Sequence, residues 1–239
     1  IKNKIFQIIL KKADKITANS KEFSKLLEKK FKVKVKSIYN PLNKKEIIKF
    51  SKLKSENIFT RKKILKIINV GRFVDQKDQI TLLKAINLLK KKLKMEVRIL
   101  GRGVEEEKLK NYISENKLNK IVKLVNFKNN PYPSIKNSEL FILTSKFEGL
   151  PNVLLEAIVL NKFVISSNCS TGPKEILDNG KGGLLFKVGD YKELAKKILF
   201  YSENKSICKK KLIFAKKRLV RFDYINNLNL YLNLIKKHL

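Results

Sequence analysis

The stretch SKFEGLPNVLLEA, residues 145–157, predicts the turn from a buried strand into a helix. It follows the apolar run 140–143, which has the length and composition of a buried strand, and it leads into an apolar segment with helical spacing. Pro151 suits the first turn of a helix, and Gly149 lets the preceding loop bend. The amides at such a helix start have no intrahelical partner and favour an anion, most often a phosphate.

Two carboxylates flank this predicted helix start. Glu148 lies in the loop before it and Glu156 lies within the helix, with seven residues between them. An isolated pair at this spacing is more often two surface glutamates on either side of an ordinary strand-to-helix joint. The Gly-Leu-Pro-Asn insert between the glutamates, together with the motifs below, favours a functional site.

This segment resembles the E-x7-E signature of family 4 retaining glycosyltransferases, in the donor half of the GT-B fold. The resemblance implies that Glu156 holds the ribose hydroxyls of a nucleotide and that Glu148 contacts the donor sugar. It also implies that backbone amides between the two glutamates meet the diphosphate. The residues whose backbone would do so are Gly149, Leu150, Asn152 and Val153.

A second motif is GRFVDQKDQ, residues 71–79, which follows a predicted strand. It resembles the family's G-R-x4-K-G element, in which the arginine and the lysine clamp the donor diphosphate. Arg72 and Lys77 take these places, after Gly71. A guanidinium can hold two phosphate oxygens, and an ammonium can neutralise charge that builds on a leaving group. Asp78 departs from the family's glycine, and a carboxylate there is expected to weaken or redirect phosphate contact.

The remaining sequence alternates strands and helices. Strands are expected at 63–70, 95–100, 121–125, 139–143 and 163–167, and helices from 77, at 104–116, 132–136, after 151, and near 191–201, 206–219 and 222–236. Such regular alternation predicts an α/β fold, a Rossmann-like parallel sheet with helices on both faces. Ligands of such sheets bind at the carboxyl ends of the strands, and every motif above lies at such an end.

Three further loops carry weaker signals. The resemblance implies that Phe127 and Lys128, in the loop that runs to residue 130, contact the nucleobase largely through backbone atoms. The turn 101–103, Gly-Arg-Gly, is as consistent with a tight strand-to-helix turn as with ligand contact. The loop 170–175 resembles the G-P-x-E-I-L element that closes on the donor side, although an ordinary helix start explains it equally well.

The ends of the chain extend the resemblance to the N-terminal, acceptor-binding domain of the family. A strand at 15–19, a helix at 21–30 and a strand at 33–39 cannot bury a core by themselves, so residues 1–40 are interpreted as a remnant of that domain. The expected boundaries continue with 41–62 as a linker or loosely packed surface helix, 63–220 as the donor-binding domain and 221–239 as a C-terminal crossover helix. The chain is therefore expected to be truncated or to need a partner chain.

The net charge of +34 raises the possibility of a nucleic-acid partner. Of the 55 basic residues only six are arginine, and the lysines are spread along the whole chain without interleaved aromatic residues. A solvated lysine surface without nucleic acid is the favoured interpretation, with peripheral contact to an anionic membrane as a second consequence. No apolar run has the length of a membrane span and no signal peptide is evident, so a cytoplasmic location is expected.

Few other residues suggest chemistry. Cys169 and Cys208 fit neither a disulfide framework nor a zinc site, and Cys169 is a bystander in a predicted site loop. His238, the only histidine, lies one residue from the end of the sequence, which is a poor place for a catalytic base. No paired-aspartate metal motif is present, and the resemblance implies catalysis without a metal.

Three functional hypotheses follow. The first is a hexosyl-type glycosyltransferase that moves a sugar, with retention, from a nucleotide-sugar donor to a hydroxyl of a glycan or lipid-linked acceptor in cell-envelope synthesis. The second is a donor-binding subunit that needs an acceptor-binding partner chain. The third is a basic nucleic-acid or membrane-surface protein with a similar α/β fold.

Overall fold

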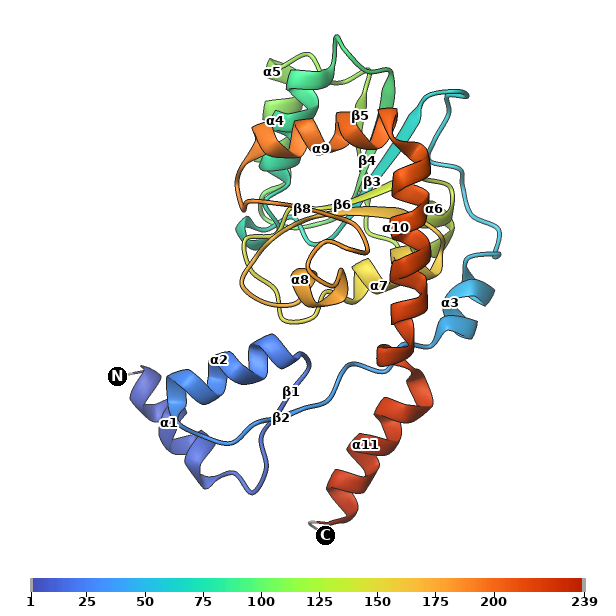
Figure 1. The fold of residues 1–239 in the computed structure, drawn as a ribbon. Coiled ribbons are helices and arrows are strands. Elements are labelled where there is room, and N and C mark those ends of the chain that lie inside the picture. Colours follow the sequence, from blue (N-terminus) through green and yellow to red (C-terminus); the bar gives the residue numbers. More distant parts are fainter. Residues whose placement is uncertain (1, 238–239) are drawn as a thin grey trace.

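Six parallel strands form the central sheet of the structure, a computed structural model that describes residues 2–237 (Figure 1). The strand order is β5-β4-β3-β6-β7-β8, and each neighbouring pair is parallel. The strands are β3 Leu65–Val70, β4 Met95–Gly101, β5 Val122–Asn126, β6 Leu140–Leu143, β7 Phe163–Ser167 and β8 Leu184–Phe186. The predicted Rossmann-like α/β fold is confirmed.

Helices connect the strands and cover the sheet. They are α1 Lys2–Lys12, α2 Lys21–Phe31, α3 Lys44–Phe50, α4 Gln79–Leu89, α5 Glu106–Glu115, α6 Tyr132–Lys136, α7 Asn152–Val159, α8 Pro173–Ile176, α9 Tyr191–Glu203, α10 Lys205–Arg218 and α11 Tyr224–Lys236. Short 3-10 turns lie at Asp75–Lys77 and Leu219–Phe222. Among the helices of this described range, none is both long and apolar enough to cross a membrane.

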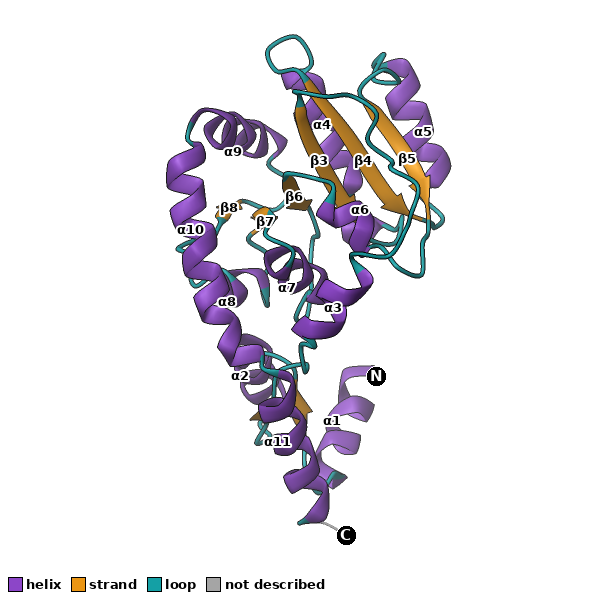
Figure 2. Ribbon diagram, turned by 90° about the vertical axis from the view of Figure 1, so that its right-hand side faces the viewer, coloured by secondary structure: helices purple, strands orange, loops and turns teal. Residues whose placement is uncertain are grey.

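Side chains alternate between the two faces of the sheet and build a separate core on each. Ile67 and Ile142 belong to the core shared with α4, α5 and α9, whereas Ile68 and Phe141 belong to the core shared with α3, α6, α7 and α10 (Figure 2). Because strands buried on both faces need apolar residues at every position, the central strands read as continuous apolar runs. This is why their positions could be predicted.

A smaller unit lies below the sheet in Figure 1 and contains α1, α2 and a two-stranded parallel sheet. Its strands, β1 Thr17–Ala18 and β2 Lys36–Ser37, are shorter than the predicted 15–19 and 33–39. Its apolar cluster is centred on Leu27 and Phe31. The helix α1 was not predicted from the sequence. The tail helix α11 runs beside this unit, where the Tyr231 hydroxyl donates to the Ile38 carbonyl at 3.1 Å.

The segment between the two units contains the surface helix α3 and packs on the larger unit. Ile58 and Phe59 are buried in a core of the larger unit. The Glu96 carboxylate accepts hydrogen bonds from the backbone amides of Thr60 and Arg61, at 3.1 to 3.2 Å. A few buried apolar residues and one carboxylate on β4 therefore fasten a stretch whose composition is mostly polar.

Several element ends differ from prediction by a few residues, and one strand was not predicted. The helix predicted from Lys77 starts at Gln79, because Asp78 has a left-handed backbone with φ 45° that ends the 3-10 turn. Pro151 directly precedes α7 as its N-cap residue. The strand β8, which is only three residues long and follows a glycine-rich turn, was not predicted. His238 lies outside the described residues.

Candidate active site

The predicted site residues lie at the carboxyl edge of the sheet. β3 and β6 are neighbours there, although about 70 residues separate them in sequence. The loop after β3 carries Arg72 and Lys77, and the loop after β6 carries Glu148. Parallel strands end at the same edge, so this strand order places the two loops side by side.

Hydrogen bonds hold these two loops together. The Lys77 ammonium lies 2.5 Å from Glu148 Oε1, and the two side chains are only 16% and 8% exposed. The Ser145 hydroxyl donates to the same carboxylate oxygen at 2.6 Å. Thr144 Oγ1 donates to the Lys77 carbonyl at 2.8 Å, and the side-chain amide of Gln76 donates to the Phe147 carbonyl at 2.9 Å. One lysine and one glutamate, both predicted from sequence motifs, are thus fixed in direct contact.

The helix α7 begins beside this ion pair with open amides. No side chain in the described part of the chain caps its start, where Pro151 is the N-cap residue. Asn152 and Val153 form its first turn, after the half-exposed Gly149. The Leu150 side chain is buried in the core, so only its backbone is available to a ligand. The geometry offers an anion the amides and the dipole of an eight-residue helix.

A cavity of about 490 Å³ opens on the other side of the β3 loop. It is lined by Val70, Gly71, Arg72, Leu100, Gly101, Arg102, Phe127, Lys128, Asn129, Pro131, Tyr132 and Glu156. Five of the predicted site residues, Gly71, Arg72, Phe127, Lys128 and Glu156, therefore share one cavity. A larger hollow of about 1020 Å³ lies between α1, α2 and α11, away from all of these residues.

Glu156 and Tyr132 form the polar end of this cavity. The Tyr132 hydroxyl donates to Glu156 Oε1 at 3.4 Å. Burial raises the pKa of Glu156 above its ordinary value of 4.5, and the Tyr132 hydrogen bond opposes this rise only in part. Burial and the neighbouring carboxylate raise the pKa of Tyr132 to about 12. Tyr132 was not predicted as a site residue, because it lies on the short helix α6 rather than in a motif.

We expect the Glu156 carboxyl to make stability and nucleotide affinity respond to pH in opposite directions. As the pH falls from neutral toward 4.5, a carboxyl with a raised folded-state pKa takes up its proton early, and this adds to the free energy of unfolding. If Glu156 holds ribose hydroxyls, as the resemblance implies, protonation also removes an acceptor and nucleotide affinity should fall. Thermal unfolding and calorimetric titration with nucleoside diphosphates across this range measure both effects. Glu156→Gln should flatten both profiles, and unchanged profiles in this variant would contradict the assignment.

Arg72 and Arg102 both line this cavity. The Arg72 carbonyl accepts from the Gln79 side chain at 2.9 Å, which fixes the backbone at this turn. Within residues 2–237 the Arg72 side chain has no ion-pair partner. The Arg102 guanidinium carbon lies 4.9 Å from the centre of the Phe127 ring, a cation–π contact at the cavity wall. Sequence reasoning left Arg102 undecided between a turn and ligand contact; the flanking glycines make the turn, and its side chain lines the cavity.

Asp78, the departure from the family motif, caps the start of α4. Its carboxylate accepts from the Thr81 backbone amide at 3.3 Å and from the Thr81 hydroxyl at 2.6 Å. The residue thus caps α4 from a left-handed backbone that glycine adopts without strain. The expectation that this carboxylate weakens or redirects phosphate contact stays a prediction.

Asp78→Ala is expected to lower the free energy of unfolding by about 1–2 kcal/mol, because alanine loses the cap and is strained in the left-handed region. Asp78→Asn should stay within about 0.5 kcal/mol, since asparagine caps equally well and tolerates this backbone. Urea unfolding of the two variants measures the difference. Equal stability of the two would show that the cap contributes nothing.

Cys169 is a buried free cysteine in the loop after β7. Its side chain is buried, and its sulfur lies 3.7 Å from the Thr171 carbonyl oxygen. Burial raises the pKa of the thiol to about 11, so it is protonated and unreactive near neutral pH. This agrees with the prediction that it is a bystander.

The fold and the edge of the sheet where its motifs meet define a Rossmann-like domain of the glycosyltransferase GT-B type. The structure superposes on Anabaena HepE in complex with UDP and glucose with a TM-score of 0.84, at 19% identity, over 98% of this chain and 66% of that one. It superposes on a TarM variant of Staphylococcus aureus, solved with fondaparinux, alpha-GlcNAc-glycerol and UDP, with a TM-score of 0.82, at 19% identity, over 97% of this chain and 45% of that one. These similarities establish the fold.

The chain belongs to the family described as glycosyl transferases group 1, whose sequence model matches residues 50–218. It is 36% identical over 190 residues to the capsular polysaccharide biosynthesis glycosyltransferase CapH of Staphylococcus aureus, covering 77% of this chain and 49% of CapH.

It is 30% identical over 224 residues to a Campylobacter jejuni enzyme, the N-acetylgalactosamine-N,N'-diacetylbacillosaminyl-diphospho-undecaprenol 4-alpha-N-acetylgalactosaminyltransferase, covering 92% of this chain and 60% of that enzyme. The chain spans about half the length of the curated relatives it matches.

Proposed function

We propose that this chain binds the nucleotide-sugar donor of a glycosyltransferase that builds cell-envelope polysaccharide or glycolipid. The enzyme would transfer a hexosyl-type sugar to a hydroxyl of a glycan or lipid-linked acceptor, with retention at the anomeric carbon. The family membership supports sugar transfer, and the names of CapH and the Campylobacter enzyme support an envelope glycan or a lipid-linked acceptor. HepE and TarM structures contain UDP, which supports a nucleotide donor.

The observation that carries this proposal is the meeting of the two motif loops. Lys77 contacts Glu148 next to the open start of α7, and the adjacent cavity runs from Arg72 to Glu156. In this arrangement a nucleoside fills the cavity and its ribose hydroxyls donate to Glu156. The diphosphate then lies between Arg72, Lys77 and the α7 amides. The sugar comes next to Glu148.

The chemistry of such a transfer is a problem of charge. The sugar becomes cation-like while a nucleoside diphosphate leaves with its bonding electrons. Arg72, Lys77 and the first-turn amides of α7 supply positive charge where negative charge grows, in a position set before the reaction begins. We propose that the reaction needs no metal, and turnover that is unchanged by excess EDTA would agree with this.

Calorimetric titration with a panel of nucleoside diphosphates and nucleotide sugars tests the proposal. Saturable binding of at least one nucleotide is expected, and the double change Glu148→Ala and Glu156→Ala should abolish it. Glu107→Ala is the matched control, because this glutamate is 77% exposed and pairs only with Lys110 on the surface of α5. An absence of saturable binding by the unaltered protein would overturn the proposal.

A second candidate is a donor-binding subunit that acts with an acceptor-binding unit. The observation that favours it is an exposed apolar face on α1, formed by Ile5, Phe6, Ile8 and Ile9, each 45% to 58% exposed. Residues 1–40 would then belong to the acceptor-binding domain, whose remaining part covers this face. Turnover measured with and without a supplied N-terminal domain distinguishes this candidate from the first.

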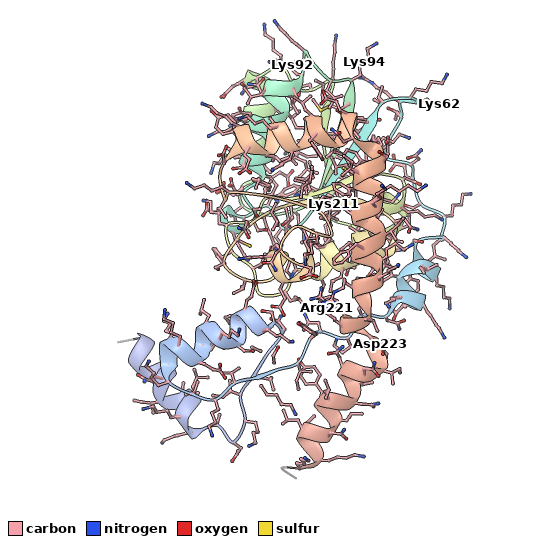
Figure 3. The ribbon with its side chains drawn as sticks, viewed as in Figure 1. Lys62, Lys92, Lys94, Lys211, Arg221 and Asp223 are labelled. Atoms are coloured by element: carbon pink, nitrogen blue, oxygen red, sulfur yellow. The ribbon has the colours of Figure 1, made fainter. Side chains whose placement is uncertain are left out.

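We also propose a cytoplasmic protein that associates with the anionic inner face of the cell membrane. The charge of +34 and the outward-pointing lysines support it, as Lys62, Lys92 and Lys94 illustrate (Figure 3). Co-sedimentation with vesicles that contain phosphatidylglycerol, but not with neutral vesicles, is the expected result.

A further inference from the structure

The start of α2 is held by a carboxylate from the other unit of the protein. Glu175, on α8, accepts hydrogen bonds from the backbone amides of Lys21 and Glu22, both at 3.1 Å. These are first-turn amides of α2, which have no partner within their own helix. A residue of the larger unit thus occupies the start of a helix in the smaller unit, and Figure 1 shows α2 directly below α8.

The contact is reciprocal, because a carboxylate of α2 reaches back across the same seam. Glu22 Oε2 accepts from the backbone amide of Gly172, at 3.0 Å, at the position that starts α8. The Tyr39 hydroxyl donates to Glu175 Oε1. Arg221, which Figure 3 shows near the junction of the two units, donates to the carbonyls of Glu175 and Ile176, each at 3.2 Å. Each of the two carboxylates thus accepts amide hydrogen bonds at the start of the other residue's helix.

Holding these two acids close together is electrostatically unfavourable. Burial and the nearby Glu175 charge raise the pKa of Glu22, although the hydrogen bond from Gly172 opposes this rise. Amide N–H groups, the Tyr39 hydroxyl and the positive ends of two helices offset the repulsion. An arrangement of this kind fixes one relative position of the two units, since a small slide would leave both acids without donors.

The contact between the two units also packs against the loop after β6, which carries Glu148; this loop is called the donor loop below. A Cβ on Gly172, whose φ is +91°, would overlap the Gly149 carbonyl and lie 2.6 Å from the Pro151 ring. The Thr171 hydroxyl donates to the Glu148 carbonyl. On the other side, a Cβ on Gly149 would lie 3.2 Å from the Asn19 side-chain oxygen. The loop that carries Glu148 is therefore packed between the strand-to-α2 turn and the start of α8.

We propose that Glu22 and Glu175 are positioning residues that seat α2 on the donor loop and thereby fix Glu148 and the start of α7 for the donor diphosphate. This inference rests on the proposed function for its effect on donor binding. The effect on the loop itself is independent of any ligand. Neither glutamate touches the donor; they act through the contacts of Gly172 and Thr171 with the loop.

Hydrogen exchange and UDP titration of single and double variants test the inference. Glu22→Ala and Glu175→Ala should each weaken UDP binding about tenfold. The double variant should bind UDP no more weakly than either single variant, because both acids maintain the same contact between the two units. In the ligand-free protein, amide exchange should accelerate in residues 148–153 as well as in the first turn of α2. Glu175→Gln, which keeps an acceptor oxygen, should recover most of the affinity.

Glu193→Ala is the matched control, because Glu193 also accepts a backbone amide hydrogen bond, from Lys187 at 2.8 Å, beside a different helix start. It should leave UDP affinity and exchange at 148–153 unchanged. Faster exchange in α2 alone, with unaltered 148–153, would overturn the inference. If the unaltered protein binds no nucleotide, the proposed function fails, while the exchange of the ligand-free loop still decides whether these glutamates position it.

Discussion

Alanine in place of Arg72 or of Lys77 is expected to slow sugar transfer by about 10²–10³-fold, the effect of removing one preorganised donor from a developing negative charge. Both residues follow β3 at its carboxyl end, where Arg72 lines the cavity and Lys77 contacts Glu148. The leaving diphosphate carries more negative charge in the transition state than the bound donor does. The loss should therefore appear in kcat more than in the affinity for UDP.

The assay measures the release of UDP from a UDP-sugar by the protein in the presence of an acceptor-binding unit. Lys146→Ala is the matched control, because Lys146 lies in the loop after β6 but pairs with Asp75 and is 41% exposed. Its rate should stay within about twofold of the unaltered protein, as expected for a surface ion pair. Transfer at the normal rate in both Arg72→Ala and Lys77→Ala would remove these residues from the mechanism.

Lys77→Ala has a second expected consequence, because Lys77 neutralises Glu148 in the ligand-free structure. Glu148 is only 8% exposed in the intact pair, and without the ammonium its carboxylate would keep the Ser145 hydroxyl as a donor. Donor binding would then bring a diphosphate toward an unpaired negative charge. In the proposed mechanism the lysine would serve both states, as the partner of Glu148 before binding and as a partner of the diphosphate afterwards.

Gly101→Ala is expected to lower the free energy of unfolding by about 3 kcal/mol, because it overpacks the point where β3 and β4 end. A Cβ on Gly101 would overlap the backbone carbonyl of Gly71 and lie 2.8 Å from the Phe73 ring. Backbone atoms cannot give way as the end of a flexible side chain can. Relief would require the loop with Arg72 to move, so nucleotide binding should be lost along with stability.

Gly71→Ala is the matched control within the same turn. A Cβ there would meet only the Lys77 side chain, at 3.5 Å or more, which is ordinary van der Waals contact. We expect a change in stability below about 1 kcal/mol. Urea unfolding of both variants measures the contrast, and similar values for the two would show that the close approach of these turns is not a packing constraint.

Much of the site could be predicted because its signals are local. The motif around Arg72 and Lys77 and the motif around Glu148 and Glu156 each lie within one stretch of chain, directly after an apolar strand. Arg102 and Tyr132 lacked such signals. Arg102 lies in a common type of turn, and Tyr132 lies on a five-residue helix that no motif marks. Their part in the cavity depends on where β4 and α6 end in space.

The sequence by itself predicted the alternation of strands and helices from β3 to β7 and the edge of the sheet where the motif residues lie. It could do so because burial on both faces demands continuous apolar strands, and because parallel strands share one direction. Only the tertiary structure decided which loops meet. The contact of Lys77 with Glu148 requires β3 to lie next to β6. The hydrogen bond from the Glu22 backbone amide to the Glu175 carboxylate joins residues 153 positions apart. Such pairings depend on strand order and on docking of units, which sequence spacing does not encode.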